Sequence, residues 1–380
     1  MKITNVIPYP LGCTIKEPFA YSQKWFKKRT ALLIKVETDE GISGWGESFC
    51  HDAWPALVEL IKRVYKPLLI GKDALAREVI WSLLYNWTRD YGQKGLTMAA
   101  ISGVDIALWD IAGKVAGMPV SKLLGGNFSE SIEAYATGLY ITEKILKDPM
   151  ILAEEALRYS AKGFKGIKMK VGFGLDIDVR NVQCVRQAIG SSVKLMVDAN
   201  HAYSPAMSIR LARQLENLDI FWFEEPVVPE DLDGYLEVRH RTSIPVAGGE
   251  AEFTRYGFSQ LLSRRCVDFV QPDICITGGI SETLKIAALA STFGTRLVPH
   301  VWGTGVALAA ALHFIASQPH NPPSLNSDSM LLELDCTENL LREESLAVPL
   351  ALEDGHLAVP QGPGLGIEVD EAFLERYKQV

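Results

Sequence analysis

Hydrophobic residues follow two different rhythms along the chain. In residues 1–50 they gather in strand-like runs such as Ala31–Glu37. From about residue 53 to 118 they recur every three to four residues, which is typical of helices, and Ala99–Met118 is the longest such segment. Strands followed by helices predict a segregated α+β domain over residues 1–125.

After Gly125-Gly126, short apolar runs alternate with helical segments as far as about residue 345. This alternation indicates parallel βαβ units, and seven or eight of them are enough for a (β/α) barrel. A doubly wound open sheet is the alternative, but no Gly-x-Gly-x-x-Gly follows the first of these strands to indicate a dinucleotide fold. The expected strands are Ala134–Gly138, Gly166–Val171, Lys194–Val197, Ile220–Phe223, Ile244–Ala247, Asp268–Val270, Arg296–Val298 and Leu331–Leu334.

Composition narrows the class of protein. The 380 residues are 48% hydrophobic and 22% charged, which is ordinary for a globular chain and excludes a disordered or fibrous one. The net charge of −8 gives no general attraction to nucleic acid or anionic lipid. We expect no membrane span, because no uncharged apolar stretch of about 18 residues occurs. The N-terminus lacks a signal core, and the six scattered cysteines form no Cys-x-x-Cys pair, so a reduced, cytoplasmic chain is expected.

Ionisable residues follow the expected barrel strands at regular intervals. Asp198, Glu224 and Glu250 are separated by 26 residues each, and Asp273 and His300 follow after 23 and 27 more. One βα unit has about this length, so these residues are expected at equivalent positions at the carboxyl ends of successive strands. Active sites of (β/α) barrels lie at that end.

The three carboxylates predict a metal site. Asp198, Glu224 and Glu250 on adjacent strands would repel one another strongly, and a hard divalent cation is the natural compensation. Ligands that are all oxygen suit Mg²⁺, and the absence of Cys or His from the set argues against zinc. Helix N-caps after the strands are the alternative, but Glu is a poor N-cap.

Lys168 and Lys170 are two residues apart and therefore share one face of a strand, while Ile167, Met169 and Val171 share the other. In a barrel the apolar face would meet the helices and the lysines would point inward. Two neighbouring ammonium groups lower each other's pKa, so one of them is expected to act as a base near neutral pH. The alternative is an exposed edge strand guarded by lysines, which a position second in the series disfavours.

Asp273 and His300 form the expected acid–base pair across the pocket from the lysines. An aspartate beside a histidine fixes its tautomer and stabilises the imidazolium. We expect His313 and His320 to be structural. Two acid–base groups on opposite sides of a metal-bound substrate suit removal of a proton from the carbon next to a carboxylate, with the metal and Lys168 stabilising the enediolate.

This series, with Glu333 on the last strand, resembles the enolase superfamily, specifically the mandelate racemase subgroup of the mandelate racemase/muconate lactonizing enzyme family, over essentially the whole chain. The resemblance implies a (β/α)7β-type TIM-like barrel over 126–345. It also implies an N-terminal α+β capping domain over 1–125, completed by a returning C-terminal tail over 346–380. The resemblance implies a homo-oligomer, from a dimer to an octamer.

The resemblance also implies roles for individual residues. Lys170 would be the base, and Lys168 would lower its pKa and neutralise the substrate carboxylate. Glu333 would hydrogen-bond the carboxylate or enediolate as an acid, with Asp335 as a rival for this position. Asn200 would touch a substrate hydroxyl.

Longer stretches resemble the galactarolactone cycloisomerases, namely Arg89–Leu96, Phe223–Glu230 and Val298–Val306. That family opens an aldaric acid lactone by proton abstraction and β-elimination of the ring carboxylate. We expect the same reaction here, on a small-molecule substrate that carries a carboxylate. The alternatives are an acid-sugar dehydratase in which His300 protonates the departing hydroxyl, a racemase or epimerase, and a non-catalytic sugar-acid-binding protein.

Substrate choice in this family lies in the capping loops, here about residues 14–29 and 47–56. We assign Tyr21 and Lys27 to substrate binding, together with Trp302 from the barrel. Lys27 and its basic neighbours would contact a dianionic substrate; the alternative is that they form a solvated face.

Overall fold

The computed structural model describes residues 1–325 and 329–379, and it begins with a three-stranded antiparallel sheet in the order β1-β2-β3. Helix α4 lies against this sheet, and glycines allow the close approach. A Cβ atom on Gly46 would lie 1.9 Å from the carbonyl oxygen of Gly103 in α4. The elements are β1 (Ile3–Tyr21), β2 (Lys24–Thr38), β3 (Ser43–Ser48), α1 (Trp54–Leu60), α2 (Lys66–Leu69), α3 (Arg77–Thr88) and α4 (Leu96–Ala116).

Helix α4 is the core helix of this first domain. By length and composition it could cross a membrane, but 94% of its most apolar window is buried inside the protein. It packs on β3, on β2 and on α3. Its C-terminus is capped by Gly117 in the left-handed conformation, φ +65°, which glycine adopts without strain.

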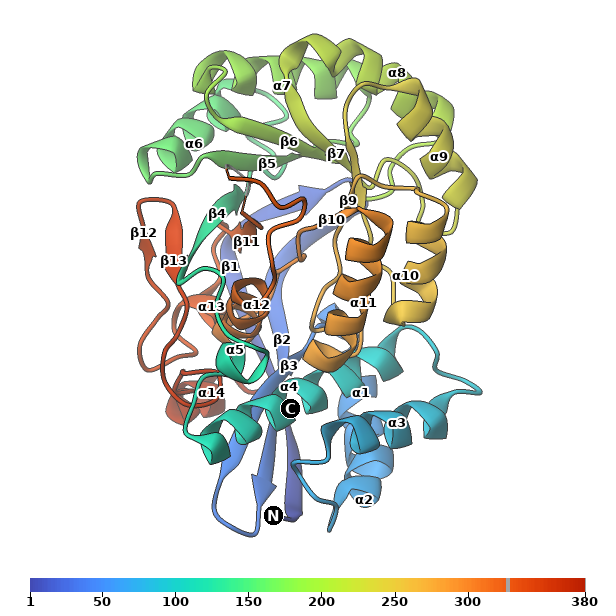
Figure 1. The fold of residues 1–380 in the computed structure, drawn as a ribbon. Coiled ribbons are helices and arrows are strands. Elements are labelled where there is room, and N and C mark those ends of the chain that lie inside the picture. The colour runs from blue at the N-terminus through green and yellow to red at the C-terminus, as the bar shows by residue number, and fades with distance from the viewer. Residues whose placement is uncertain (326–328, 380) are drawn as a thin grey trace.

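The rest of the chain forms the expected barrel, with helices around a ring of parallel strands (Figure 1). Within the described residues, β4 to β10 pair in sequence order, and β11 pairs in parallel with β4, so the last strand lies beside the first. Seven helices connect the eight strands, which confirms the (β/α)7β type. The strands are β4 (Ser131–Thr137), β5 (Gly166–Lys170), β6 (Lys194–Asp198), β7 (Ile220–Glu224), β8 (Val246–Gly248), β9 (Phe269–Val270), β10 (Arg296–Leu297) and β11 (Leu332–Asp335), and the helices are α6 (Met150–Ala161), α7 (Leu175–Ile189), α8 (Pro205–Leu215), α9 (Leu232–Arg241), α10 (Thr254–Ser263), α11 (Gly279–Phe293) and α12 (Gly305–Ala316).

The two faces of β5 separate core from chemistry. Ile167 and Met169 pack in the main core between strands and helices, while Lys168 and Lys170 point inward and are 1% and 7% exposed. The interior of the barrel also contains a layer of large side chains, among them Tyr135 and Trp222. This layer fills the part of the barrel interior that precedes the carboxyl ends of the strands.

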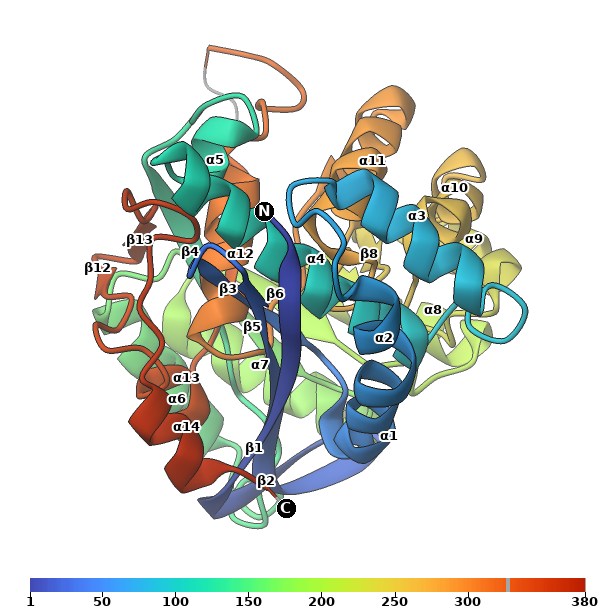
Figure 2. The same cartoon turned by 90° about the horizontal axis from the view of Figure 1, so that it is seen from below.

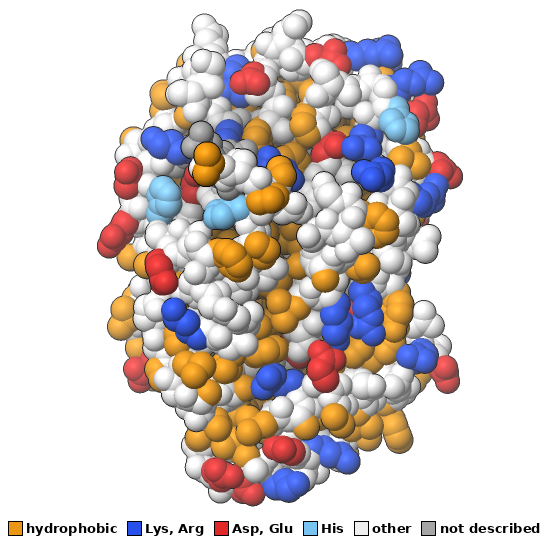
Figure 3. Space-filling view, viewed as in Figure 1, with side chains coloured by type: hydrophobic (Ala, Val, Ile, Leu, Met, Phe, Trp, Pro, Cys, Tyr) orange, Lys and Arg blue, Asp and Glu red, His pale blue; other side chains and the backbone are white. Residues whose placement is uncertain are grey.

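The C-terminal tail contacts both domains. The hairpin of β12 (Leu352–Glu353) and β13 (His356–Ala358) extends the barrel sheet, because β13 pairs antiparallel with β4. Helix α14 (Glu371–Tyr377) packs on β1 of the first domain, as seen from below in Figure 2. On the face shown in Figure 3, acidic and basic side chains are interspersed.

Candidate active site

Three carboxylates meet at the carboxyl ends of adjacent strands. Asp198 ends β6, Glu224 ends β7 beside it, and Glu250 follows β8 by two residues. One oxygen from each lies within 4.8 Å of the others, and the side chains of Asp198 and Glu224 are fully buried. Anionic oxygens this close in a buried place need a cation, and an all-oxygen set fits a hard divalent ion.

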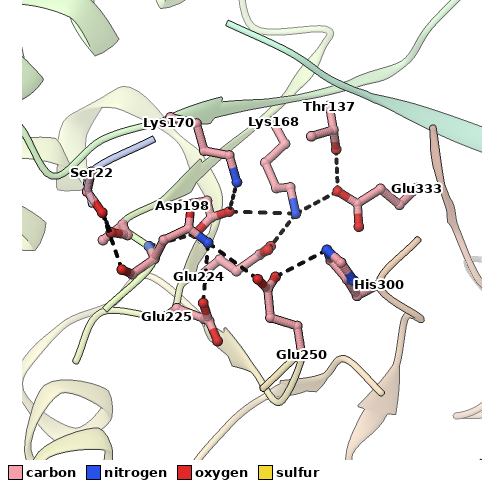
Figure 4. A network of polar contacts seen from close by, with 12 residues as sticks. Ser22, Thr137, Lys168, Lys170, Asp198, Glu224, Glu225, Glu250, His300 and Glu333 are labelled. Carbon is pink, nitrogen blue, oxygen red and sulfur yellow. Dashed lines mark hydrogen bonds and ion pairs between the residues drawn. The ribbon is translucent and has the colours of Figure 1, made fainter. Parts of the chain in front are cut away.

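Both lysines of β5 reach this group (Figure 4). Lys170 Nζ lies 2.5 Å from Asp198 Oδ2. Lys168 Nζ lies 2.5 Å from Glu224 Oε1 and 2.8 Å from Glu333 Oε1, so it is enclosed by carboxylates. Lys170 lines the cavity above them, whereas Lys168 does not.

The expected lowering of the lysine pKa values is wrong for this arrangement. Burial lowers the pKa of Lys170 and so does its repulsion by Lys168, but the attraction of Asp198, Tyr140 and Glu250 is larger and raises it above its usual value. The pKa of Lys168 is raised too, because Glu224 and Glu333 outweigh its burial. The carboxylates that the fold places beside the lysines outweigh the repulsion between the two neighbouring ammonium groups.

His300 faces the carboxylates from the other side. Its Nδ1 lies 2.7 Å from Asp273 Oδ2, which fixes the tautomer, and its Nε2 lies 3.7 Å from Glu250 Oε2. Burial opposes the charged form, but Glu250, Glu333 and Asp273 together raise the pKa of His300 to about 10. The arrangement therefore favours a protonated imidazole, which can give a proton.

Glu333 points into the site, whereas Asp335, the alternative residue for the same role, does not. Glu333 accepts hydrogen bonds from Thr137 Oγ1 at 2.5 Å and from the backbone N–H of Val301 at 3.1 Å. Burial favours the neutral form, but Lys168 and His300 lower the pKa of Glu333 to about 2, which favours the carboxylate in this arrangement. Asp335 pairs with Arg29 outside the cavity.

A cavity of about 320 Å³ lies above this cluster, which is within the usual range for small-ligand sites. Asn200, Tyr21 and Trp302 line it, as expected. The Oδ1 atom of Asn200 is buried and has no hydrogen-bond partner among the described residues.

Lys27 does not line this cavity, so its assignment to substrate binding is wrong. On β2 successive side chains point to opposite faces, and Phe26 occupies the cavity side while Lys27 is exposed. Sequence reasoning missed several lining residues, and the aromatic character of the capping segments was the available signal. The missed residues include Phe26, Phe49, His51, Tyr140, His201 and Phe253.

Comparisons with known proteins agree with this geometry. Residues 3–125 match the mandelate racemase/muconate lactonizing enzyme N-terminal domain, and residues 151–373 match the enolase C-terminal domain-like family. D-galactarolactone cycloisomerase of Agrobacterium fabrum is 45% identical over 100% of this chain and 99% of its own. Arabinonate dehydratase of Saccharolobus solfataricus is 38% identical over 91% of this chain and 90% of its own.

Solved structures show the same fold. The 3,6-anhydro-D-galactonate cycloisomerase of Zobellia galactanivorans is 44% identical and superposes with a TM-score of 0.90 over 100% of both chains. A racemase of Streptomyces coelicolor with bound magnesium is 30% identical, with a TM-score of 0.89 over 99% of this chain and 100% of that one.

Proposed function

The chain is an enzyme of the mandelate racemase/muconate lactonizing enzyme family, within the enolase superfamily of lyases and isomerases, and we propose that it removes the proton α to the carboxylate of a sugar-derived acid or its lactone. One observation carries the proposal. Lys170 and the Asp273-supported His300 approach the same group of three carboxylates from opposite sides (Figure 4). A substrate carboxylate held above that group would present its α carbon to both.

Asp198, Glu224 and Glu250 are the residues that would hold Mg²⁺. Their oxygens converge, all three are hard ligands, and a racemase with the same fold contains magnesium. A bound Mg²⁺ supplies Lewis-acid stabilisation of the negative charge that the substrate carboxylate gains as the α proton leaves.

The protein's own groups handle the protons. Lys170 takes the α proton after giving up its own, which a cation held by Asp198 would favour, because it would replace the attraction between that carboxylate and the ammonium group. Lys168 stays charged between Glu224 and Glu333 beside the developing enediolate. His300 supplies a proton from the opposite side.

The relatives support ring opening as the overall reaction. The α C–H bond breaks, its electron pair forms a double bond to the β carbon, and the β carbon–oxygen bond breaks with its pair on the ring oxygen. In a lactone this oxygen leaves as a carboxylate, and the resulting enol becomes a 2-keto-3-deoxy acid. Dehydration of an open-chain acid, with His300 protonating the departing hydroxyl, is the second candidate, favoured by the similarity to a dehydratase.

Proton NMR in D₂O with Mg²⁺ tests the proposal on a panel of aldonates, aldarates and aldarolactones. We expect deuterium at the α carbon or a keto-deoxy product from at least one of them. Silence across the panel, with metal binding demonstrated, would overturn the sugar-acid assignment.

A further inference from the structure

The outer wall of the active-site cavity comes mainly from the capping domain. It is built of aromatic rings, among them Phe26 and Phe49, with Trp302 of the barrel closing one side. His51 lies in the middle of this wall. Its ring centroid is 4.5 Å from that of Phe49, 5.4 Å from Trp302 and 5.7 Å from Phe26.

The backbone of His51 has an uncommon conformation. Its φ of +44° is in the left-handed region, which few residues other than glycine adopt, and such positions concentrate at binding sites. Within residues 1–325 and 329–379 neither ring nitrogen of His51 has a hydrogen-bond partner. The ring lines the cavity, and its imidazole has one donor and one acceptor to offer.

His51 carries no charge at neutral pH. Burial, together with the positive charge of Lys24, lowers its pKa to about 4 against the opposing effect of Asp52. A neutral imidazole can hydrogen-bond to hydroxyl groups and ring oxygens, but it has no positive charge to neutralise an anion.

The cations of the capping segment face away from the cavity. Lys24 and Lys28 both pair with Asp52, at 2.8 Å and 3.1 Å. Arg29 pairs with Asp335 and stacks on the far side of Trp302, with its guanidinium carbon 4.0 Å from the ring centroid. These cations line a separate recess behind Phe26, His51 and Trp302, and none of them lines the large cavity.

Lys170 is thus the one Lys or Arg among the described residues that lines the large cavity, and it lies at the catalytic end. His201 also lines the cavity, but its Nε2 atom is already paired with Glu225 Oε2, which lies 3.1 Å away. A carboxylate at the outer wall would lose water without gaining a counter-charge, which is unfavourable.

We infer that the outer wall selects a substrate with a single carboxylate and an uncharged distal end, a lactone or ether ring or a hydroxylated chain, for which His51 is the hydrogen-bonding partner. This inference rests on the proposed function. It has a consequence for turnover, because opening a lactone releases a second carboxylate against this wall, which favours departure of the product.

The test compares substrates that differ in the charge of the distal end. In the Mg²⁺-loaded enzyme we would measure kcat/KM for galactonate, galactarate and the 1,4-lactone of galactaric acid, with α-deuterium exchange as a second readout. We expect the best single-carboxylate compound to exceed the dianion galactarate by at least about 100-fold. We also expect the dianionic product of the lactone to inhibit with a Ki well above the substrate KM.

Three variants test whether substrate binding at the outer wall depends on His51. His51→Gly removes the ring where glycine tolerates the backbone, and we expect KM for the single-carboxylate substrate to rise about tenfold or more with a smaller change in kcat. His51→Asn keeps an uncharged donor and acceptor and also tolerates φ above zero, so it should recover most of the loss. Lys27→Ala is the matched control, since Lys27 is exposed on the other face of β2 and should change neither constant.

Each outcome bears on one claim. Equal or better turnover of galactarate, or an unchanged KM in His51→Gly, would overturn the inference while leaving the proposed function standing. Absence of α-deuterium exchange with every compound would instead overturn the proposed function. If a His51 variant fails to fold, the substrate comparison on the natural enzyme still decides.

Discussion

Lys170 Nζ lies 2.5 Å from Asp198 Oδ2, so the group placed to take the substrate proton is held by a carboxylate placed to hold the metal. The second oxygen of Asp198 accepts from the backbone N–H of Asn200 at 2.9 Å. Both side chains are buried, and each is the other's main compensation. A cation held by Asp198 would compete with Lys170 for the charge of this carboxylate, which would couple metal binding to the proton on the base.

Substitution of Lys170 tests which group takes the first proton. Lys170→Ala should abolish α-deuterium exchange, with kcat/KM down by at least about 10³-fold, because general-base catalysis is worth about 10²–10⁴-fold. His300→Asn should keep exchange and lose product formation where the leaving group needs a proton. NMR in D₂O separates the two variants. Exchange that persists in Lys170→Ala and vanishes in His300→Asn would reverse the roles.

Asp273 acts on the reaction through His300. Asp273→Asn keeps the size of the side chain but removes the charge that fixes the imidazole at 2.7 Å. We expect kcat to fall at least about tenfold with little change in KM, since the substrate itself is not touched. The readout is steady-state kinetics beside Cys275→Ala, a control two residues away whose backbone N–H, not its thiol, bonds Asp273. A rise in KM alone would contradict the positioning role.

The metal ligands should respond to charge removal in two ways. Asp198→Asn should weaken Mg²⁺ binding by at least about tenfold and also lower the free energy of unfolding, because Lys170 is left buried without its counter-ion. Calorimetric Mg²⁺ titration and denaturant unfolding measure the two effects. Glu230→Gln is the control, since this exposed carboxylate follows the same strand as Glu224 but lies outside the group. Unchanged Mg²⁺ affinity in Asp198→Asn would contradict the assigned site.

Much of the fold was predictable because the pattern that specifies it is local. Each of the eight expected barrel strands overlaps an observed one, since parallel strands buried on both faces are continuous apolar runs. The near-constant spacing from Asp198 to His300 placed these residues at one end of the barrel, and the structure brings them together. Helix α12 was harder to recognise, because it is apolar all round and has no polar face to show its period.

What escaped prediction depends on distances that no local pattern contains. The raised pKa values of the lysines arise from carboxylates on other strands. The error at Lys27 is a matter of register, because a shift of one residue along β2 exchanges the cavity face for the solvent face. His51 is placed by a three-residue 3₁₀ turn (His51–Ala53) that has no periodicity to detect.

His313 gives a pH-dependent prediction for stability away from the active site. It is fully buried in α12, where Nδ1 accepts from the backbone N–H of Ser121 at 3.3 Å and Nε2 donates to the carbonyl of Leu365 at 3.0 Å, joining α12 to α5 (Val120–Leu123) and the tail. Burial lowers the pKa of His313 to about 4. The unfolded chain therefore binds a proton here between about pH 6.5 and 4 that the folded chain does not, so stability falls as the pH falls through this range.

The loss attributable to His313 should reach about 2 kcal/mol at pH 5 relative to pH 7.5. His313→Gln is expected to be less stable at pH 7.5, because two buried hydrogen bonds are perturbed, but its stability should fall less steeply with acid. Urea unfolding at the two pH values for both proteins gives the difference of differences, in which other titrating groups cancel. His320→Gln is the control, since His320 lies at the rim of a surface pocket and not in the core of α12. Equal acid sensitivity in His313→Gln and the natural protein would show that the buried imidazole is not the group responsible.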